Sequence, residues 1–160
     1  MTQPAGPLVA DLRQVRVPDG TRLAYRRYGR EGATRVVLCD GISCDGYIWR
    51  DLLPTLATNC DVLHLNYRGH GRSGLPRDPA NCSLPDLAAD MDYVLGALGW
   101  ATDATIPGPI FIGHSMGVQV ALETAFRYPT RVGAMVLCCG SFGRVLDSFN
   151  VGEGVYVRAL

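Results

Sequence analysis

The stretch that decides the fold is residues 110–121, IFIGHSMGVQVA, where an apolar run is followed by a Gly-X-Ser-X-Gly motif. The run at 110–112 is apolar throughout, which is typical of a strand buried on both faces. From Val118 onward apolar residues recur at helical spacing, and Pro129 marks the end of that helix. A strand and a helix placed this close together predict a sharp turn at Ser115.

The glycines on either side of Ser115 suit such a turn. A strand that turns directly into a helix forces the residue at its apex into a strained backbone conformation, and Gly113 and Gly117 provide the space that the turn needs. The serine oxygen is then lifted above the sheet at the amino end of a helix, whose dipole favours developing negative charge. The sequence therefore predicts that Ser115 is a nucleophile.

A nucleophilic serine also needs N–H groups that stabilise the oxyanion formed during the reaction. The first predicted donor is the backbone N–H of Met116, the residue after the nucleophile. The second is expected after the preceding central strand, where residues 40–42 read Asp-Gly-Ile. Gly41 allows a close approach there, and the N–H of Ile42 is the candidate donor. Because Asp40 places a carboxylate beside this site, we expect it to be hydrogen-bonded away from the reaction.

The rest of the chain alternates between apolar runs and amphipathic stretches. We expect a hairpin over 15–28, buried strands over 36–39, 62–65 and 134–139, and helices over 48–57 and 84–98. A capping box from Ser83 to Asp86 opens the last of these helices. Strands without polar alternation, separated by helices, predict an α/β fold with a mostly parallel sheet covered on both faces. In such a sheet the chemistry lies at the carboxyl ends of the strands.

The composition narrows the function classes. With 48% hydrophobic and 19% charged residues, the 160-residue chain is expected to form one globular domain. Fifteen basic residues balance fifteen acidic ones without a block of like charge, so we expect no nucleic-acid partner and no membrane surface. No secretory signal pattern is visible, which favours the cytoplasm. The six cysteines lack metal-binding spacing, so reduced thiols and no metal site are expected.

On the Gly113–Gly117 motif, the Asp40-Gly41-Ile42 loop and the glycine-rich run RGHGRSG over 68–74, the chain resembles the α/β-hydrolase superfamily. The resemblance extends over nearly the whole chain and is to the serine esterase, lactonase and cofactor-free haloperoxidase branch. It implies Ser115 as the nucleophile, a small-molecule ester or lactone as the substrate and no cofactor. The oligomeric state stays open. In one departure, the family usually has histidine where this sequence has Asp40.

The same resemblance implies a catalytic acid and then a histidine after the nucleophile. No histidine follows Ser115, and the three that the sequence contains are all upstream of it. We expect His64 to be a core residue and His114 to point to the face opposite the serine. His70 is a candidate substitute base, although nothing in the sequence orients it. Asp147 comes too early for the usual acid and is expected on the surface.

The absent base predicts that residues 1–160 are the amino-terminal part of a single hydrolase domain, truncated before its last strands. Residues 141–160 would begin a lid segment or a truncated tail. The run 134–139 would then be an apolar edge of the sheet, and edges of this kind promote aggregation. We therefore expect the polypeptide alone to be poorly soluble and nearly inactive.

Three features of the sequence allow an alternative interpretation. Residues 69–74 fit a dinucleotide-binding Gly-X-Gly-X-X-Gly pattern, but no helix opens on that turn, so a turn braced by Arg68 and Ser73 is preferred. Tyr47 and Trp49 could line an acyl pocket, but their spacing favours the core. A non-catalytic remnant or binding protein that retains the hydrolase fold stays open as the second function class.

Overall fold

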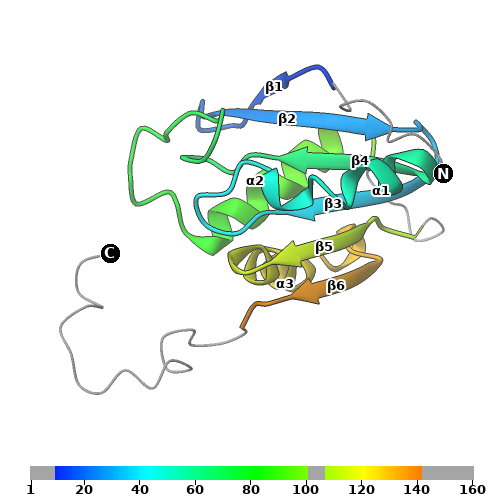
Figure 1. Cartoon of the computed structure of the whole chain (residues 1–160). Coiled ribbons are helices and arrows are strands. Elements are labelled where there is room, and N and C mark those ends of the chain that lie inside the picture. Colours follow the sequence, from blue (N-terminus) through cyan, green and yellow to red (C-terminus); the bar gives the residue numbers. More distant parts are fainter. Residues whose placement is uncertain (1–9, 101–106, 142–160) are drawn as a thin grey trace.

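Six strands form one mixed sheet in the computed structural model, which describes residues 10–100 and 107–141 (Figure 1). The strands lie side by side in the order β1-β2-β4-β3-β5-β6. Their bounds are β1 Arg13–Arg16, β2 Arg22–Gly29, β3 Thr34–Cys39, β4 Cys60–Leu65, β5 Ile110–His114 and β6 Ala134–Cys138. The helices are η1 Tyr47–Trp49, α1 Leu53–Asn59, α2 Leu84–Ala97, α3 Met116–Arg127 and η2 Pro129–Arg131. The predicted fold class is confirmed.

The amino-terminal hairpin pairs β1 with β2 in antiparallel register, as the sequence predicts. Its turn needs a left-handed residue, and Gly20 supplies it with a φ of 88°. The carboxylate of Asp19 accepts a hydrogen bond from the N–H of Thr21 at 2.8 Å and fixes the turn. Strand β2 then pairs antiparallel with β4, whereas β4, β3, β5 and β6 are all parallel to one another.

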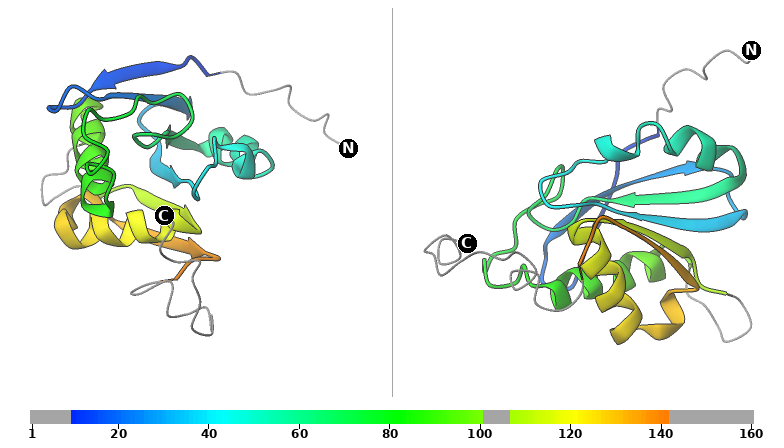
Figure 2. Two further views of the ribbon diagram at one scale, coloured as in Figure 1. Left: turned by 90° about the vertical axis from the view of Figure 1, so that its left-hand side faces the viewer. Right: turned by 60° about the horizontal axis from the view of Figure 1, so that its bottom comes forward.

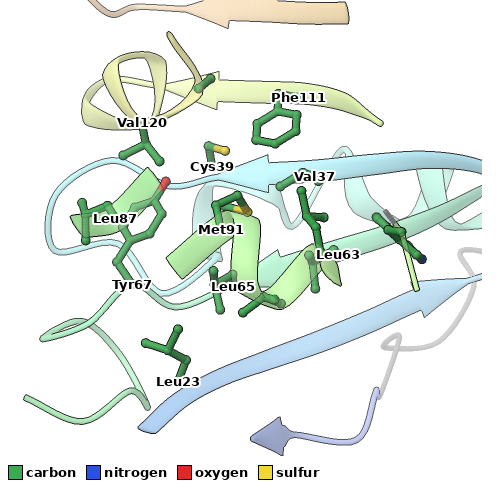
Figure 3. Packing of buried hydrophobic residues seen from close by; sticks show 14 of the residues in the cluster. Leu23, Val37, Cys39, Leu63, Leu65, Tyr67, Leu87, Met91, Phe111 and Val120 are labelled. Atoms are coloured by element: carbon green, nitrogen blue, oxygen red, sulfur yellow. The ribbon is translucent and has the colours of Figure 1, made fainter. Parts of the chain in front are cut away.

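Successive residues of the central strands enter two different cores. Val37 of β3 and Phe111 of β5 pack with α2 and α3 in the larger core (Figure 3). Their neighbours Val36 and Ile112 pack on the opposite face, which α1 covers. Figure 2 shows these helices on the two sides of the sheet. This double burial explains why the strands are continuous apolar runs rather than alternating ones.

Helix α2 begins and ends as its sequence signals predict. The N–H of Ser83 donates to Oδ2 of Asp86 at 2.9 Å, which is one half of the capping box. Past the last turn, Gly99 has a φ of 69°, and the N–H of Trp100 returns to the carbonyl oxygen of Leu95 at 2.8 Å.

The helix expected over 48–57 is wrong as a single element. The structure has the short turn η1 and then α1, which begins only at Leu53. Pro54 is the physical reason, because a proline lacks the N–H that would continue a helix from the preceding turn and is tolerated only in a first turn.

Strand β6 is an outer strand of the described sheet, as the sequence predicts for residues 134–139. Its side chains Met135, Val136 and Leu137 are between 38% and 48% exposed, so the expected apolar edge is confirmed. Within residues 10–100 and 107–141, no helix is both long and apolar enough to cross a membrane.

Candidate active site

Ser115 lies between the end of β5 and the start of α3, with a φ of 54° and a ψ of −119°. A positive φ is costly for a residue with a side chain, so the strained conformation expected at this position is confirmed. Backbone contacts hold it. The N–H of Ser115 donates to the carbonyl oxygen of Cys138 in β6 at 3.1 Å, and its own carbonyl accepts from the N–H of Val118 at 3.0 Å.

The glycines around Ser115 let three backbone segments touch. A Cβ placed on Gly117 would lie 1.9 Å from the carbonyl oxygen of Cys39, and one on Gly113 would lie 2.6 Å from the carbonyl oxygen of Gly117. Gly140, which follows β6 and which the sequence does not single out, lies against this turn and against Val118 of α3. A Cβ there would approach the carbonyl oxygen of Ser115 to 2.9 Å. No motif marks that position in the sequence.

The loop after β3 reaches the serine because β3 and β5 are neighbouring parallel strands, with Cys39 opposite Gly113. A Cβ on Gly41 would lie 3.1 Å from Cβ of Ser115, which is tighter than an ordinary contact. Past Gly41 the chain turns, and the N–H of Cys44 donates to the Gly41 carbonyl at 3.3 Å. The side chain of Ile42 in this turn is 63% exposed.

Met116 is the first residue of α3. The N–H groups of a helix's first turn have no acceptor within the helix, so this donor is available in the way that an oxyanion site requires. The side chain of Met116 is partly buried and packs against the larger core. The assignment of Ile42 and Met116 as oxyanion donors stays a prediction.

Asp40 is buried, and its carboxylate is hydrogen-bonded as expected. Its Oδ1 accepts from Nε1 of Trp49 at 2.6 Å, and its Oδ2 accepts from the N–H of Gly46 at 2.9 Å. Nε2 of His64 lies 2.8 Å from the same Oδ2. His64 is therefore a partnered core residue, as predicted. Trp49 is buried as expected, but the prediction that Tyr47 is a core residue is wrong, because Tyr47 lies on the surface and is 63% exposed.

Of the other two histidines, His70 lies on the loop after β4, and His114 is the last residue of β5, directly before Ser115. Nδ1 of His70 lies 3.1 Å from the carbonyl oxygen of Arg68, and since a carbonyl only accepts, Nδ1 carries the proton. Nδ1 of His114 lies close to Gly41, since a Cβ there would be 3.3 Å away, and it has no hydrogen-bond partner among the described residues. Asp147 and the rest of 142–160 lie outside the described residues.

The glycine-rich loop over 68–74 is a braced turn, as predicted. Ser73 donates through Oγ to the carbonyl oxygen of Asn66 at 2.6 Å and accepts from the N–H of Ala24 at 2.9 Å. Arg68 forms a buried pair with Asp90 of α2, with its Nε donating at 2.7 Å and its Nη2 at 2.5 Å.

Asn66 is a structural residue of this region that the sequence analysis missed. Its Nδ2 donates to Oδ1 of Asp45 at 2.9 Å, and its Oδ1 accepts from the N–H of Arg72 at 3.1 Å. It therefore ties the loop after β3 to the loop after β4. The sequence signal that could have identified Asn66 is its position directly after β4, because the carboxyl ends of the parallel strands, where Ser115 also lies, carry the functional residues in such sheets.

The ionisable groups near the serine do not suggest a second nucleophile. Burial raises the pKa of the Cys39 thiol to about 12, which keeps it protonated and unreactive. Burial also raises the pKa of the Tyr67 hydroxyl well above its usual range. All six cysteines are free. Within the part of the chain that the structure describes, no three His, Cys, Asp or Glu side chains are grouped to hold a metal.

Comparison with known proteins agrees with this architecture. Residues 34–153 match the alpha/beta hydrolase fold family, and the chain belongs to that family.

Several of its relatives have names that describe hydrolysis of small molecules. The chain is 31% identical over 120 residues to "Putative carbamate hydrolase RutD" of Caulobacter segnis, covering 74% of this chain and 43% of that protein. It is 33% identical over 122 residues to bifunctional epoxide hydrolase 2 of Sus scrofa, covering 76% of this chain and 20% of that protein. It thus spans less than half the length of these relatives.

Solved structures of hydrolases superpose on the described fold. A hydrolase from Pseudomonas aeruginosa PA01 gives a TM-score of 0.74 at 29% identity, covering 86% of this chain and 49% of that one. Est816, described as an N-acyl homoserine lactone degrading enzyme, gives 0.67 at 28% identity, covering 80% of this chain and 45% of that one.

Proposed function

We propose that this chain carries the nucleophile and the oxyanion site of a serine hydrolase that cleaves an ester or lactone bond of a small molecule. The observation that carries the proposal is the placement of Ser115. It has a φ of 54° at the carboxyl end of β5, and Gly41 of the neighbouring loop lies against it. Strained residues of this kind cluster at active sites, where the surrounding fold compensates for their cost.

In the proposed reaction, Oγ of Ser115 bonds to the carbonyl carbon of the substrate while its proton passes to a base. The carbonyl oxygen becomes an oxyanion that accepts hydrogen bonds from the N–H groups of Ile42 and Met116. Collapse of this intermediate expels the alcohol, which takes up the proton, and leaves an acyl-enzyme. Water then hydrolyses the acyl-enzyme, which releases the acid and restores the serine. The family resemblance assigns the base to a later histidine, and residues 116–160 contain none.

The comparisons support a small-molecule substrate. The relatives are named as carbamate and epoxide hydrolases, and Est816 as a lactone-degrading enzyme, so their named substrates are small molecules with a polarised carbon. A serine at position 115 suits acyl transfer to oxygen, which favours an ester or lactone within that range. We also assign the protein to the cytoplasm, since its six cysteines are all unpaired thiols.

The second candidate is a non-catalytic member of the family that retains the fold and binds a ligand or a partner. The observation that favours it is the lack of any histidine after Ser115. The two candidates differ in whether the Ser115 hydroxyl is reactive.

A fluorophosphonate probe distinguishes these candidates in the whole chain. In the reaction Oγ of Ser115 bonds to phosphorus, fluoride leaves, and the hydroxyl proton passes to the solvent. One addition to the probe needs no turnover, so we expect slow labelling even though the usual base is absent from residues 116–160. Mass spectrometry should locate the adduct on Ser115, and Ser115→Ala should abolish it. Ser83→Ala, which removes a hydroxyl from the cap of α2, is the control and should label normally. An inert Ser115 in the folded wild-type chain would overturn the serine-hydrolase proposal and favour the non-catalytic one.

A further inference from the structure

The Asp40 carboxylate is 2% exposed and accepts hydrogen bonds from three donors on two segments of the chain. Its donors are the indole of Trp49 in η1, the backbone N–H of Gly46 and the imidazole of His64 in β4, at 2.6, 2.9 and 2.8 Å. A buried carboxylate is costly unless it is paired and hydrogen-bonded, and here every contact is of the strong, charge-assisted kind. Asp40 therefore links the segment 46–49 that follows its own loop to His64, which lies 24 positions further along the chain.

These contacts enclose the loop that approaches Ser115. Asp40 stands directly before Gly41, and the N–H that it binds belongs to Gly46 at the far end of the loop. The hydrogen bond from Gly46 to the carboxylate thus closes the loop over residues 41–46. A second hydrogen bond, from the N–H of Cys44 to the Gly41 carbonyl, forms a tighter turn within that loop. A loop tied at both ends has little freedom to move its N–H groups.

His64 also holds the loop by a packing contact between its imidazole ring and the backbone of Gly46. A Cβ placed on Gly46 would lie 2.7 Å from Cε1 of the imidazole, and Gly46 has a φ of 76°. The Gly46 backbone therefore lies directly on the His64 ring. Asn66, two positions further along the chain, adds another tie through Oδ1 of Asp45 at 2.9 Å. His64 in β4 and Asn66 directly after β4 therefore hold the loop at two adjoining points.

We infer that Asp40 and His64 are positioning residues that fix the 41–46 loop so that the N–H of Ile42 faces the oxygen developing at Ser115. The inference rests on the proposed function, because the charged oxygen develops only if Oγ of Ser115 attacks a substrate carbonyl or the phosphorus of a phosphonate. Donors that are held in place before the reaction stabilise charge without reorganisation, and loss of one oxyanion donor costs about 10²–10³ in rate.

The same network explains how this protein tolerates a carboxylate where its family usually has histidine. A free carboxylate beside an oxyanion would repel it. Here both oxygens of Asp40 accept hydrogen bonds, and all three donors direct their positive ends at the carboxylate. Asp40 therefore acts on the reaction through the loop it holds and not by touching the substrate.

The test measures the rate of Ser115 labelling by a fluorophosphonate and the phosphorus NMR shift of the adduct in the whole chain. We expect His64→Leu to slow labelling about 10-fold or more and to move the phosphorus shift, because the phosphoryl oxygen loses an aligned N–H. His64→Gln, whose amide can still donate to Asp40, should recover most of the rate. Trp49→Phe keeps a six-membered aromatic ring but loses the five-membered part of the indole with its Nε1 donor, and it provides a second variant should His64→Leu fail to fold.

The matched control is Asp61→Asn. Asp61 is a buried carboxylate on the same strand as His64, but it pairs with Arg27 at the opposite end of that strand. It should lose stability in urea without a change in labelling rate or phosphorus shift. Equal labelling of all folded variants, or slowing of Asp61→Asn to the same degree as His64→Leu, would overturn the inference while the proposed function stands. An unlabelled wild-type Ser115 would remove both.

Discussion

Gly117 of α3 lies against the last residue of β3, with its Cα so close to Cys39 that an added Cβ would stand 1.9 Å from the Cys39 carbonyl oxygen. Both partners are backbone, so neither can rotate away. We expect Gly117→Ala to lower the free energy of unfolding by about 3 kcal/mol or more, because α3 must move off the sheet. Urea denaturation followed by circular dichroism measures the change.

The control for this prediction is Gly96→Ala in α2, where the nearest atom to an added Cβ is Nη2 of Arg131 at 3.7 Å. The same chemical change should stabilise the protein there by about 0.5–1 kcal/mol, since alanine loses less conformational freedom in a helix. Destabilisation of both variants by similar amounts would show that the contact with Cys39 is not the cause.

The buried pair of Arg68 and Asp90 is expected to be critical for stability. Their side chains are 6% and 2% exposed, and burial raises the pKa of Asp90 even though Arg68 opposes that rise. We expect Asp90→Ala to cost about 3 kcal/mol, because it leaves Nε and Nη2 of the buried guanidinium without an acceptor, while Nη1 keeps Asp19 and the Asn81 carbonyl. Asp51→Ala removes the exposed partner of Arg50 and should change stability by less than about 0.5 kcal/mol. Equal effects in thermal denaturation would refute the distinction.

Stability should fall in acid partly through Asp19. Thr21, whose backbone N–H donates to Oδ1 at 2.8 Å, and then Arg68 hold the pKa of Asp19 below its ordinary value of 3.8. The unfolded chain therefore binds this proton first as the pH falls, so the contribution of Asp19 is complete near neutrality and is lost in acid. The wild type should exceed Asp19→Asn in stability at pH 7, and the difference should shrink by pH 3.5. A difference independent of pH in urea titrations would contradict this.

The apolar edge formed by β6 is expected to drive self-association of the chain. Val136 is 48% exposed in the middle of that strand. A lysine in its place puts a charge on the edge, and charged side chains are a common protection against edge-to-edge pairing. We expect Val136→Lys to reduce light scattering of the concentrated chain. Gln14→Lys on β1, the opposite edge strand, is the control and should have little effect; equal scattering from both variants and the wild type would exclude β6 as the cause.

His70 is not expected to act as the base for Ser115. General-base catalysis contributes about 10²–10⁴ in rate, so a catalytic His70 would make His70→Ala almost inert toward a fluorophosphonate. We expect its labelling rate to stay within about threefold of the wild type. Nδ1–H of His70 donates to the Arg68 carbonyl and holds the ring in the braced turn, and among the described residues no hydrogen bond joins that ring to Ser115. A loss of 10² or more would instead identify His70 as the substitute base.

The sequence predicts the sheet well and the contacts between loops poorly. Runs such as 36–39 and 62–65 are apolar on both faces, so strand positions follow from local pattern alone. The sharp turn at Ser115 also follows from local pattern, because a strand and a helix leave no other connection. The helix expected over 48–57 failed at Pro54, where one missing N–H outweighs apolar periodicity.

The ties of the 41–46 loop depend on residues far apart in the chain. His64 meets Asp40 across 24 positions, and Asn66 meets Asp45 across 21. No periodicity marks such pairs, since they arise only when β3 and β4 lie side by side. The expectation that Asp40 must find donors was sound on electrostatic grounds, but the identity of those donors required the fold.

The chain's two tryptophans lie on opposite faces of the sheet, each in a different electrical environment. The Trp49 indole donates to a carboxylate, whereas the Trp100 ring has the guanidinium groups of Arg27 and Arg35 each 5.7 Å from its centre. The two indoles should therefore differ in the wavelength of their emission maximum and in the degree to which their fluorescence is quenched. The two tryptophans are therefore natural fluorescent probes of the two cores, and they allow the packing of each core during refolding to be followed separately.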